Sequence, residues 1–185
     1  EESDEYPFAG YKDVLGGIYQ IIKSGSGKKI LDIGFGTGIL SKKLYDEGYC
    51  VNGMDFSEKM IEIAAAKMPE AVLCRHDFTK GLPETFKNER FDAIICTYAI
   101  HHLSVSQQTA LLKELKEHLL PQGKILIGDV AFETMEELDH CREISRDDWD
   151  DEEIYPVAEI LRTDFPDILF QKVSFCAGIL ILPAA

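Results

Sequence analysis

The chain has 185 residues, of which 45% are hydrophobic and 28% charged, which is typical of one globular domain rather than of a disordered segment. Its formal net charge of −14 disfavours a nucleic-acid backbone as the main partner, because such binding depends on clustered Lys and Arg. The longest apolar runs are far shorter than the roughly 20 residues that a membrane-spanning helix needs, so we expect no membrane segment.

The first half of the chain predicts three helices that alternate with three strands. Helices are indicated by apolar residues at spacings of three and four, and strands by short apolar runs between turn residues. In chain order the predicted elements are a helix over 6–23, a strand over 28–33, a helix from 39 towards Gly48, a strand over 49–54, a helix between Ser57 and Pro69, and a strand over 71–74.

The second half adds two strands and a closing hairpin. Strands are predicted over 91–96 and 124–128, and the helix between them opens at the capping box Ser104-Val-Ser-Gln107. Five strands separated by helices require a parallel sheet with helices on both faces, because crossovers are right-handed. Residues 168–175 and 177–182 are almost contiguous, so we expect a hairpin with one antiparallel strand. The predicted fold is therefore α/β, with a doubly wound, mostly parallel sheet.

One stretch of the second half is strongly acidic. Between Glu133 and Glu153 there are eleven acids against only Arg142 and Arg146, and the stretch begins with a second capping box, Thr134-Met-Glu-Glu137. We predict a solvated helix and loop outside the sheet. We find no internal repeat and no domain boundary, and we therefore expect a single domain over 1–185.

A glycine-rich turn carries the clearest functional signal. The strand over 28–33 runs directly into Gly34-Phe-Gly-Thr-Gly38, and a helix follows. Glycines at such a turn let the backbone bend sharply and let a ligand approach with no Cβ in the way. Asp55 ends the next strand, where a carboxylate can accept hydrogen bonds from both hydroxyls of a ribose. The two features together predict a nucleoside site.

Two residues bear on which nucleoside is bound. The dinucleotide fingerprint has its third small residue at position 39, where this chain has Ile39. Asp32 stands inside the first strand, where an acid repels a pyrophosphate but can bind an ammonium group. An amino-acid-bearing nucleoside is therefore favoured over a dinucleotide, and over a glycine turn without a ligand.

These motifs resemble those of class I methyltransferases of the ubiquinone/menaquinone-biosynthesis type, over residues 28–183. Two departures are a Gln at position 122, where a Gly is usual, and the lack of a Tyr-Asp pair before residues 5–8 that would cover the cofactor. The matching segments are Leu31–Gly38, Gly53–Ser57, Arg75–Phe78, Phe91–Cys96 with Tyr98–Leu103, and the turn over 119–124.

The resemblance implies a Rossmann-like fold and S-adenosylmethionine as cofactor, with S-adenosylhomocysteine as product. A substrate nucleophile would attack the sulfonium methyl group in line, while the protein positions both molecules and excludes water. In this family the Asp that corresponds to Asp77 meets the adenine amino group. The predicted cofactor-binding residues are Asp32, Gly34, Gly36, Gly38, Asp55, Phe56, Asp77, Phe78, Thr97 and Tyr98.

Two adjacent histidines follow the fourth strand, at the carboxyl edge where open α/β sheets bind ligands. We name His101 as the candidate catalytic residue, acting as a general base. The alternatives for His101 and His102 are a cofactor contact, a helix cap, or packing beside the cofactor. No carboxylate or Cys stands at metal-ligand spacing from this pair, so we expect no metal.

Two other functions stay open. A NAD-type Rossmann oxidoreductase is disfavoured by Ile39, and we identify no catalytic Tyr-x-x-x-Lys pair; a non-catalytic nucleoside-cofactor-binding protein needs no further residues. For a methyltransferase we expect a small-molecule acceptor, selected by residues 1–27 and by an insertion over 131–166. Because the chain begins without a Met, we expect the first of these covers to be trimmed.

The cysteines indicate a compartment. Their number is odd, they are widely scattered, and no C-x-x-C pair occurs, so we expect reduced thiols in a cytoplasmic protein. Separately, we expect a monomer or a homodimer.

Overall fold

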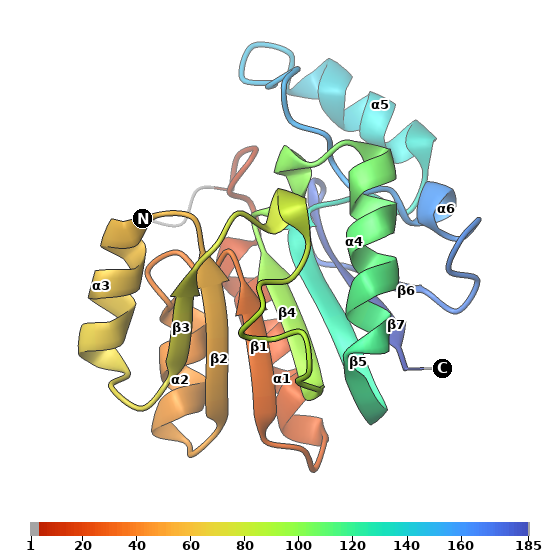
Figure 1. The fold of residues 1–185 in the computed structure, drawn as a ribbon. Coiled ribbons are helices and arrows are strands. Elements are labelled where there is room, and N and C mark those ends of the chain that lie inside the picture. Colours follow the sequence, from red (N-terminus) through yellow and green to blue (C-terminus); the bar gives the residue numbers. More distant parts are fainter. Residues whose placement is uncertain (1–3, 185) are drawn as a thin grey trace.

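A seven-stranded sheet forms the centre of the computed structural model, which describes residues 4–184 (Figure 1). Residues 1–3 of the predicted segment 1–27 therefore lie outside the described residues. The strand order is β3-β2-β1-β4-β5-β7-β6. The strands are β1 (Lys29–Ile33), β2 (Cys50–Asp55), β3 (Val72–Arg75), β4 (Phe91–Thr97), β5 (Leu119–Val130), β6 (Leu169–Lys172) and β7 (Ala177–Pro183).

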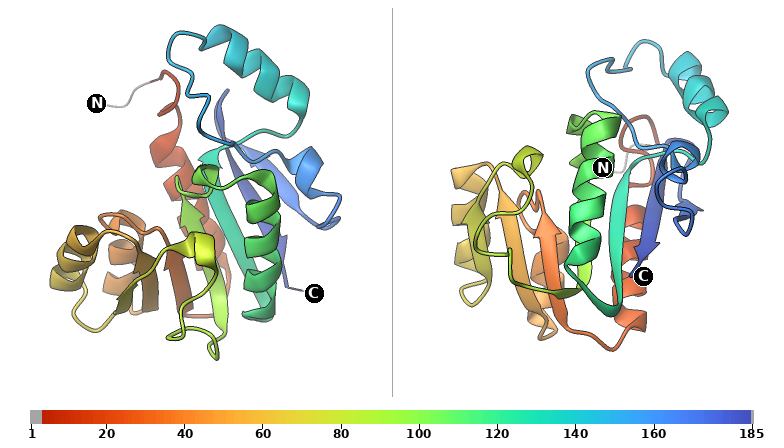
Figure 2. Two further views of the ribbon diagram at one scale, coloured as in Figure 1. Left: turned by 45° about the horizontal axis from the view of Figure 1, so that its top comes forward. Right: turned by 45° about the vertical axis from the view of Figure 1, so that its right-hand side comes forward.

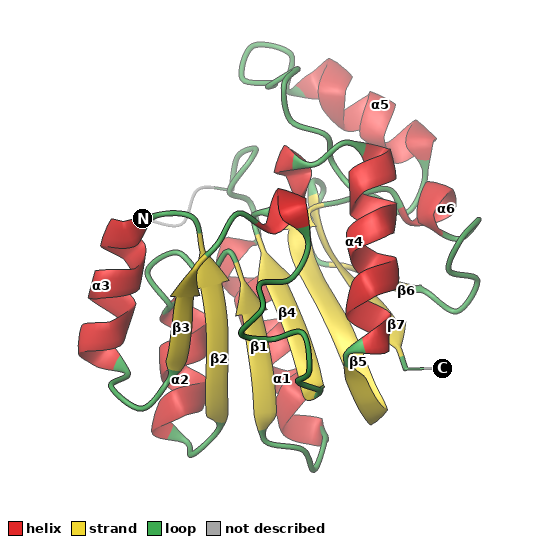
Figure 3. Cartoon of the chain, in the orientation of Figure 1, coloured by secondary structure: helices red, strands yellow, loops and turns green. Residues whose placement is uncertain are grey.

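Helices cover both faces of this sheet, as predicted. Figures 2 and 3 show α4 on one face and α1 and α2 on the other, while α5 lies beyond the carboxyl edge of the strands. The helices are α1 (Tyr11–Ser24), α2 (Ile39–Asp46), α3 (Glu58–Lys67), α4 (Val105–Glu117), α5 (Met135–Ile144) and α6 (Ala158–Leu161), with short 3-10 helices η1 (Phe78–Lys80) and η2 (Ile100–His102).

The strand directions confirm the predicted Rossmann-like, doubly wound fold. Strands β1 to β5 pair in parallel, whereas β7 pairs antiparallel with both β5 and β6. The predicted hairpin at the end of the chain therefore supplies one antiparallel strand, β7. The chain leaves β1 towards β2 on one side and later places β4 on its other side, which makes the β1/β4 border a topological switch point.

Strand β4 shows why both faces need covering. Because successive side chains of a strand point to opposite faces, Ala93 and Ile95 pack in the cluster with α1 and α2. Ile94 and Cys96 pack in the other cluster, with α4. All four are buried, so helices on both faces remove apolar surface from water.

Two predicted element boundaries differ from the structure. Helix α1 begins at Tyr11 rather than at residue 6, because Gly10 has a φ of 83°, outside the helical range. Strand β5 begins at Leu119 rather than at residue 124, since Leu119 already pairs with Phe91. Within it Gln122 has a φ of 68°, the left-handed conformation that glycine adopts most easily, which explains why Gly is usual there.

The second predicted capping box is only half formed. The backbone N–H of Glu137 donates to Thr134 Oγ1 at 3.3 Å, but the Glu137 carboxylate accepts from the backbone of Glu133 instead of Thr134. At Ser104 both bonds of the box are present. Within residues 4–184 no helix combines the length and the apolar character that crossing a bilayer requires.

Candidate functional site

A crevice opens at the carboxyl ends of β1 and β4, at the topological switch point where open α/β sheets bind ligands. Five of the predicted site residues line it: Asp32, Gly34, Gly36, Thr97 and Tyr98. They come from β1, the glycine turn and the end of β4. The structure therefore brings together the residues of two motifs that are separated by about 60 positions in the chain.

The three glycines of the turn have different roles. All have positive φ, at 67° for Gly34, 54° for Gly36 and 69° for Gly38. A Cβ on Gly34 would lie 2.8 Å from Ala99, and one on Gly38 would lie 3.2 Å from Met68, so these two allow close packing. A Cβ on Gly36 would meet no atom within 4 Å. Gly36 therefore borders open space, as the approach of a ligand requires.

Asp55 holds the glycine turn in place. It is buried at the end of β2, and its carboxylate accepts hydrogen bonds from the backbone N–H groups of Gly36 at 2.9 Å and Ser57 at 2.8 Å. The second of these bonds fixes the chain just before α3. A carboxylate has more acceptor sites than these two bonds use, so Asp55 retains capacity for a ligand.

Asp32 is a buried acid with an unsatisfied oxygen. Its exposed fraction is 2%, its Oδ2 accepts a hydrogen bond from Ser41 Oγ at 2.5 Å, and its Oδ1 has no partner. Burial raises the pKa of the Asp32 carboxyl to about 7; the bond from Ser41 lowers it and the nearby Asp55 charge raises it further. A cationic ligand group beside Oδ1 would stabilise the ionised form.

The remaining predicted residues divide between a second hollow and the core. Phe56 and Asp77 line a hollow beside the ends of β2 and β3, where Phe56 is 66% exposed. Hydrogen bonds from Thr79 hold the pKa of Asp77 below its ordinary value. Phe78, in contrast, is buried in the core under α4, so its ring supports the turn from below rather than lining a hollow.

One wall of the crevice is formed by Tyr98, a predicted residue, together with Tyr11, which the motifs did not indicate. Their ring centroids are 4.9 Å apart, and Tyr11 comes from the first turn of α1. Tyr98 adopts a φ of 51°, rare for a bulky residue, and its buried hydroxyl has no partner. The only sequence signal for Tyr11 was an aromatic residue on the opening helix, which carries no positional information.

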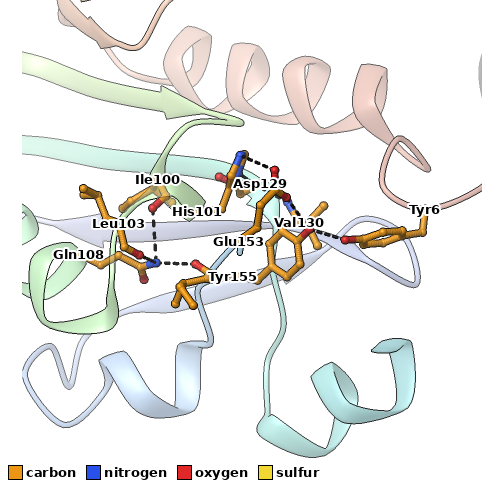
Figure 4. A network of polar contacts seen from close by, with 10 residues as sticks. Tyr6, Ile100, His101, Leu103, Gln108, Asp129, Val130, Glu153 and Tyr155 are labelled. Atoms are coloured by element: carbon orange, nitrogen blue, oxygen red, sulfur yellow. Dashed lines mark hydrogen bonds and ion pairs between the residues drawn. The ribbon is translucent and has the colours of Figure 1, made fainter. Parts of the chain in front are cut away.

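His101 lies in a buried polar network at the same edge of the sheet (Figure 4). Its Nδ1 is 2.7 Å from Asp129 Oδ1, at the end of β5, and its Nε2 is 3.5 Å from Glu153 Oε1. Tyr155 donates to Glu153 at 2.5 Å, and its hydroxyl also contacts that of Tyr6. Burial lowers the pKa of His101, but the bond to Asp129 and the nearby negative charges raise it by more.

The network overturns one step of the sequence argument. No carboxylate stands at metal-ligand spacing from the histidine pair along the chain, yet Asp129 and Glu153 reach His101 from positions 28 and 52 residues further along. Ligand atoms of His101, His102 and Glu153 all lie within 4.8 Å of one another. Spacing along the chain missed this cluster because the acidic insertion folds back over the sheet edge.

The statement that the chain has no Tyr-x-x-x-Lys pair of the oxidoreductase type also needs a correction. Tyr19 and Lys23 stand in a Tyr-x-x-x-Lys arrangement, but both donate to the carboxylate of Glu47, at the end of α2. This cluster joins two helices and contributes nothing to the crevice lining.

Unpartnered polar atoms distinguish the carboxyl edge of the sheet. Another hollow lies at the amino edge, lined among others by Gly25, Asp92 and Gln122. Among residues 4–184, three buried side-chain polar atoms lack a partner, and they belong to Asp32, Tyr98 and Asp129. All three lie at the carboxyl ends of β1, β4 and β5. Since such atoms are costly unless a ligand satisfies them, they mark this edge as the functional one.

Known proteins share both the sequence and the fold. Residues 30–123 match the model of a methyltransferase domain family. An uncharacterized methyltransferase of Oceanobacillus iheyensis is 32% identical over 179 residues, which cover 92% of this chain and 80% of the relative. One of Bacillus licheniformis is 38% identical over 130 residues, which cover 68% of this chain and 60% of that relative.

A solved structure supports the same assignment at the level of the fold. The magnesium protoporphyrin IX methyltransferase of Synechocystis, determined with bound SAH, superimposes with a TM-score of 0.73 at 19% identity. The likeness covers 95% of this chain and 84% of that structure. The chain belongs to the methyltransferase domain family and has the fold of the class I S-adenosylmethionine-dependent methyltransferases.

Proposed function

We propose that this chain transfers the methyl group of S-adenosylmethionine to a small-molecule acceptor. The observation that carries the proposal is the unpartnered, buried Oδ1 of Asp32 in the crevice that Gly36 leaves open. An ammonium group would satisfy this oxygen, and a pyrophosphate would be repelled by it. The crevice therefore fits an amino-acid-bearing nucleoside better than a nicotinamide dinucleotide.

The described residues fit the parts of this cofactor. Asp32 would bind the ammonium group, Asp55 the ribose hydroxyls, and Phe56 with Asp77 the adenine, while Gly36 leaves room for the cofactor backbone. Bound there, the cofactor supplies an electrophilic methyl group on a positively charged sulfur, and the protein orients the acceptor and excludes water.

His101 is the residue we propose to act on the acceptor. With Nδ1 bonded to Asp129, a neutral imidazole presents the lone pair of Nε2 on its other side. Nε2 is then a Lewis base at the edge of the sheet that also carries the cofactor residues. Asp129 is a positioning residue, because it fixes the tautomer and the orientation of the ring.

Two segments would cover the site in a single domain over 1–185. Residues 1–27 would cover the cofactor, a role supported by the contact of Tyr11 with Tyr98, and residues 131–166 would cover the acceptor, supported by Glu153 and Tyr155 beside His101. We further propose a cytoplasmic protein, monomeric or homodimeric, with no nucleic-acid substrate.

Thermal unfolding with added ligand tests the cofactor. S-adenosylmethionine and S-adenosylhomocysteine should raise the unfolding temperature, while NAD should not. At a ligand concentration of one hundred times Kd, binding stabilises the folded chain by about 2.7 kcal/mol. Stabilisation by NAD alone would overturn the proposal. Methyl transfer from labelled cofactor to a fractionated metabolite extract tests catalysis; if the cofactor binds and no fraction is labelled, a non-catalytic binding protein is favoured.

A further inference from the structure

Nε2 of His101 and Oε1 of Glu153 face each other at a distance longer than an ordinary hydrogen bond. When the His101 ring is neutral and its Nδ1–H donates to Asp129, Nε2 carries a lone pair, and it faces Oε1 of Glu153, which is also an acceptor. The two atoms are 3.5 Å apart, and no hydrogen bond joins them. Such an arrangement leaves two lone pairs directed at a shared space, which a cation would satisfy.

The spacing of these two atoms suits the ligand shell of a metal ion. Ligand atoms about 2.0–2.1 Å from a tetrahedral Zn²⁺ are roughly 3.4 Å from one another. The 3.5 Å between Nε2 and Oε1 matches this edge of a tetrahedron. His102 supplies a third ligand atom within the same 4.8 Å cluster, and its ring packs against that of His101 with centroids 4.3 Å apart. Within residues 4–184 the His102 ring makes no hydrogen bond, so both of its nitrogens are available.

The charges of the cluster favour a divalent cation. Asp129 is completely buried with its Oδ2 unpartnered, and Glu153 adds a second carboxylate. Among the described residues neither acid forms an ion pair with a Lys or Arg; their only ion-pair partner is His101. Burying the Asp129 carboxylate without a Lys or Arg partner is costly, and one divalent ion beside it would balance the negative charges of Asp129 and of the half-buried Glu153.

The surroundings already hold the ligands in place. The Asp129 carboxylate pairs with Nδ1 of His101, and the Tyr155 hydroxyl donates to the second oxygen of Glu153. Such hydrogen-bond partners on the non-ligating atoms orient metal ligands in proteins. The loop that carries Glu153 is tied to η2, since the backbone N–H of Ile154 donates to the carbonyl of His101 at 2.8 Å. Buried Gln108 donates to the carbonyl of Ile154 at 2.7 Å.

We propose that Nε2 of His101, a ring nitrogen of His102 and Oε1 of Glu153 bind one divalent transition-metal ion, with Zn²⁺ as the best match to two imidazoles and one carboxylate. Exposed His102 leaves the fourth position open to water or to an acceptor oxygen. This inference rests on the acceptor half of the proposed function, since it concerns the residue proposed to act on the acceptor, and it is independent of the cofactor crevice. With a metal bound, Nε2 of His101 would be a ligand rather than a free base, and the ion would polarise the acceptor in its place.

Titration of the full chain with Zn²⁺ after chelation and dialysis tests the site. Calorimetry should show one tight site per chain, and affinity should fall by more than tenfold in His102→Ala and in Glu153→Gln. His140→Ala removes an exposed histidine of α5 outside the cluster and should bind Zn²⁺ as the unsubstituted chain does. A Co²⁺ titration, read by visible absorption, should give the spectrum of a tetrahedral site.

The outcomes separate this inference from the proposed function. S-adenosylhomocysteine affinity, measured in the same proteins, should be unchanged by the substitutions at His102 and Glu153. No Zn²⁺ binding, or equal binding in all variants, overturns the metal site while cofactor binding stands. Zn²⁺ binding without cofactor binding overturns the proposed cofactor site while the metal site stands. If Glu153→Gln does not fold, His102→Ala and the Co²⁺ spectrum decide, because the side chain of His102 is exposed and removing it leaves no cavity.

Discussion

The carboxylate of Asp55 accepts a hydrogen bond from the backbone N–H of Gly36 at 2.9 Å, so the acid that ends β2 is tied to the glycine turn that follows β1. The same carboxylate accepts from Ser57. Two motifs that lie 19 residues apart therefore form one structural unit. A substitution at Asp55 is expected to act both on a ligand and on the conformation of the turn.

Replacing Asp55 by Ala should weaken S-adenosylmethionine binding by more than tenfold, which corresponds to about 1.4 kcal/mol. The variant loses a carboxylate that can accept from the ribose and that holds the turn. Calorimetry measures the affinity. Asp55→Asn keeps one acceptor oxygen, so its affinity should lie between those of the unsubstituted protein and Asp55→Ala. Unchanged affinity in a folded Asp55→Ala protein would remove this residue from the site.

Gly36→Val should abolish cofactor binding while the chain still folds. The new side chain would occupy the open space beside the turn, and the positive φ adds strain on the order of 1–3 kcal/mol. Gly48→Val is a matched control, because Gly48 has a φ of 79° and equally open surroundings but lies between α2 and β2. Both variants should lose similar stability, and only the first should lose binding; a Gly36→Val protein that binds normally contradicts the site.

Asp32→Asn should change the pH dependence of stability. An acid whose pKa is raised in the folded chain stabilises the fold below the ordinary Asp pKa of about 3.9, and this contribution is lost as the pH rises through about 7. Without cofactor, the free energy of unfolding of the variant should therefore exceed that of the unsubstituted protein at pH 8, by a few kcal/mol at most. Near pH 4 the two free energies should be equal.

Denaturant unfolding at the two pH values measures this difference. Asp167→Asn, in an exposed acid before β6 that forms no ion pair among the described residues, should show no such trend. S-adenosylhomocysteine should bind Asp32→Asn more weakly at pH 8, because the ammonium group loses its carboxylate. Identical pH profiles for the Asp32 variant and the unsubstituted protein would show that Asp32 is not held in the described environment.

Tyr98→Phe should leave the cofactor-free protein as stable as before, or about 1 kcal/mol more stable, because it removes a buried hydroxyl without a partner. Tyr155→Phe is the contrasting control, since its hydroxyl donates to Glu153, and it should lose about 1 kcal/mol. Thermal unfolding of both variants measures the contrast. Equal losses would mean that the Tyr98 hydroxyl has a partner in solution.

The charge of the chain predicts no binding of tRNA or duplex DNA at about physiological salt. With a net charge of −14, and acids crowded into the segment beside His101, negative charges outnumber the cations that a phosphate backbone requires. A gel-shift titration measures this. Micromolar, salt-sensitive binding would reject a small-molecule acceptor and leave the cofactor assignment unaffected.

The sequence by itself determined the fold and singled out the residues of the proposed cofactor half of the site. Short apolar runs separated by amphipathic helices have few arrangements other than a doubly wound parallel sheet, and Gly34-Phe-Gly-Thr-Gly38 lies between strand and helix in consecutive residues. Local patterns suffice in such cases because the interacting groups are near each other in the chain or are related by one crossover.

Only the tertiary structure brought together the residues of the proposed acceptor half. Asp129 and Glu153 meet His101 because the end of β5 and the returning acidic loop reach the same edge, and Tyr11 reaches Tyr98 from another helix. Likewise, burial rather than motif decided that Phe78 supports the turn from within the core. Contacts between distant segments depend on how loops pack over the sheet, and no periodicity or local spacing in the chain records that packing.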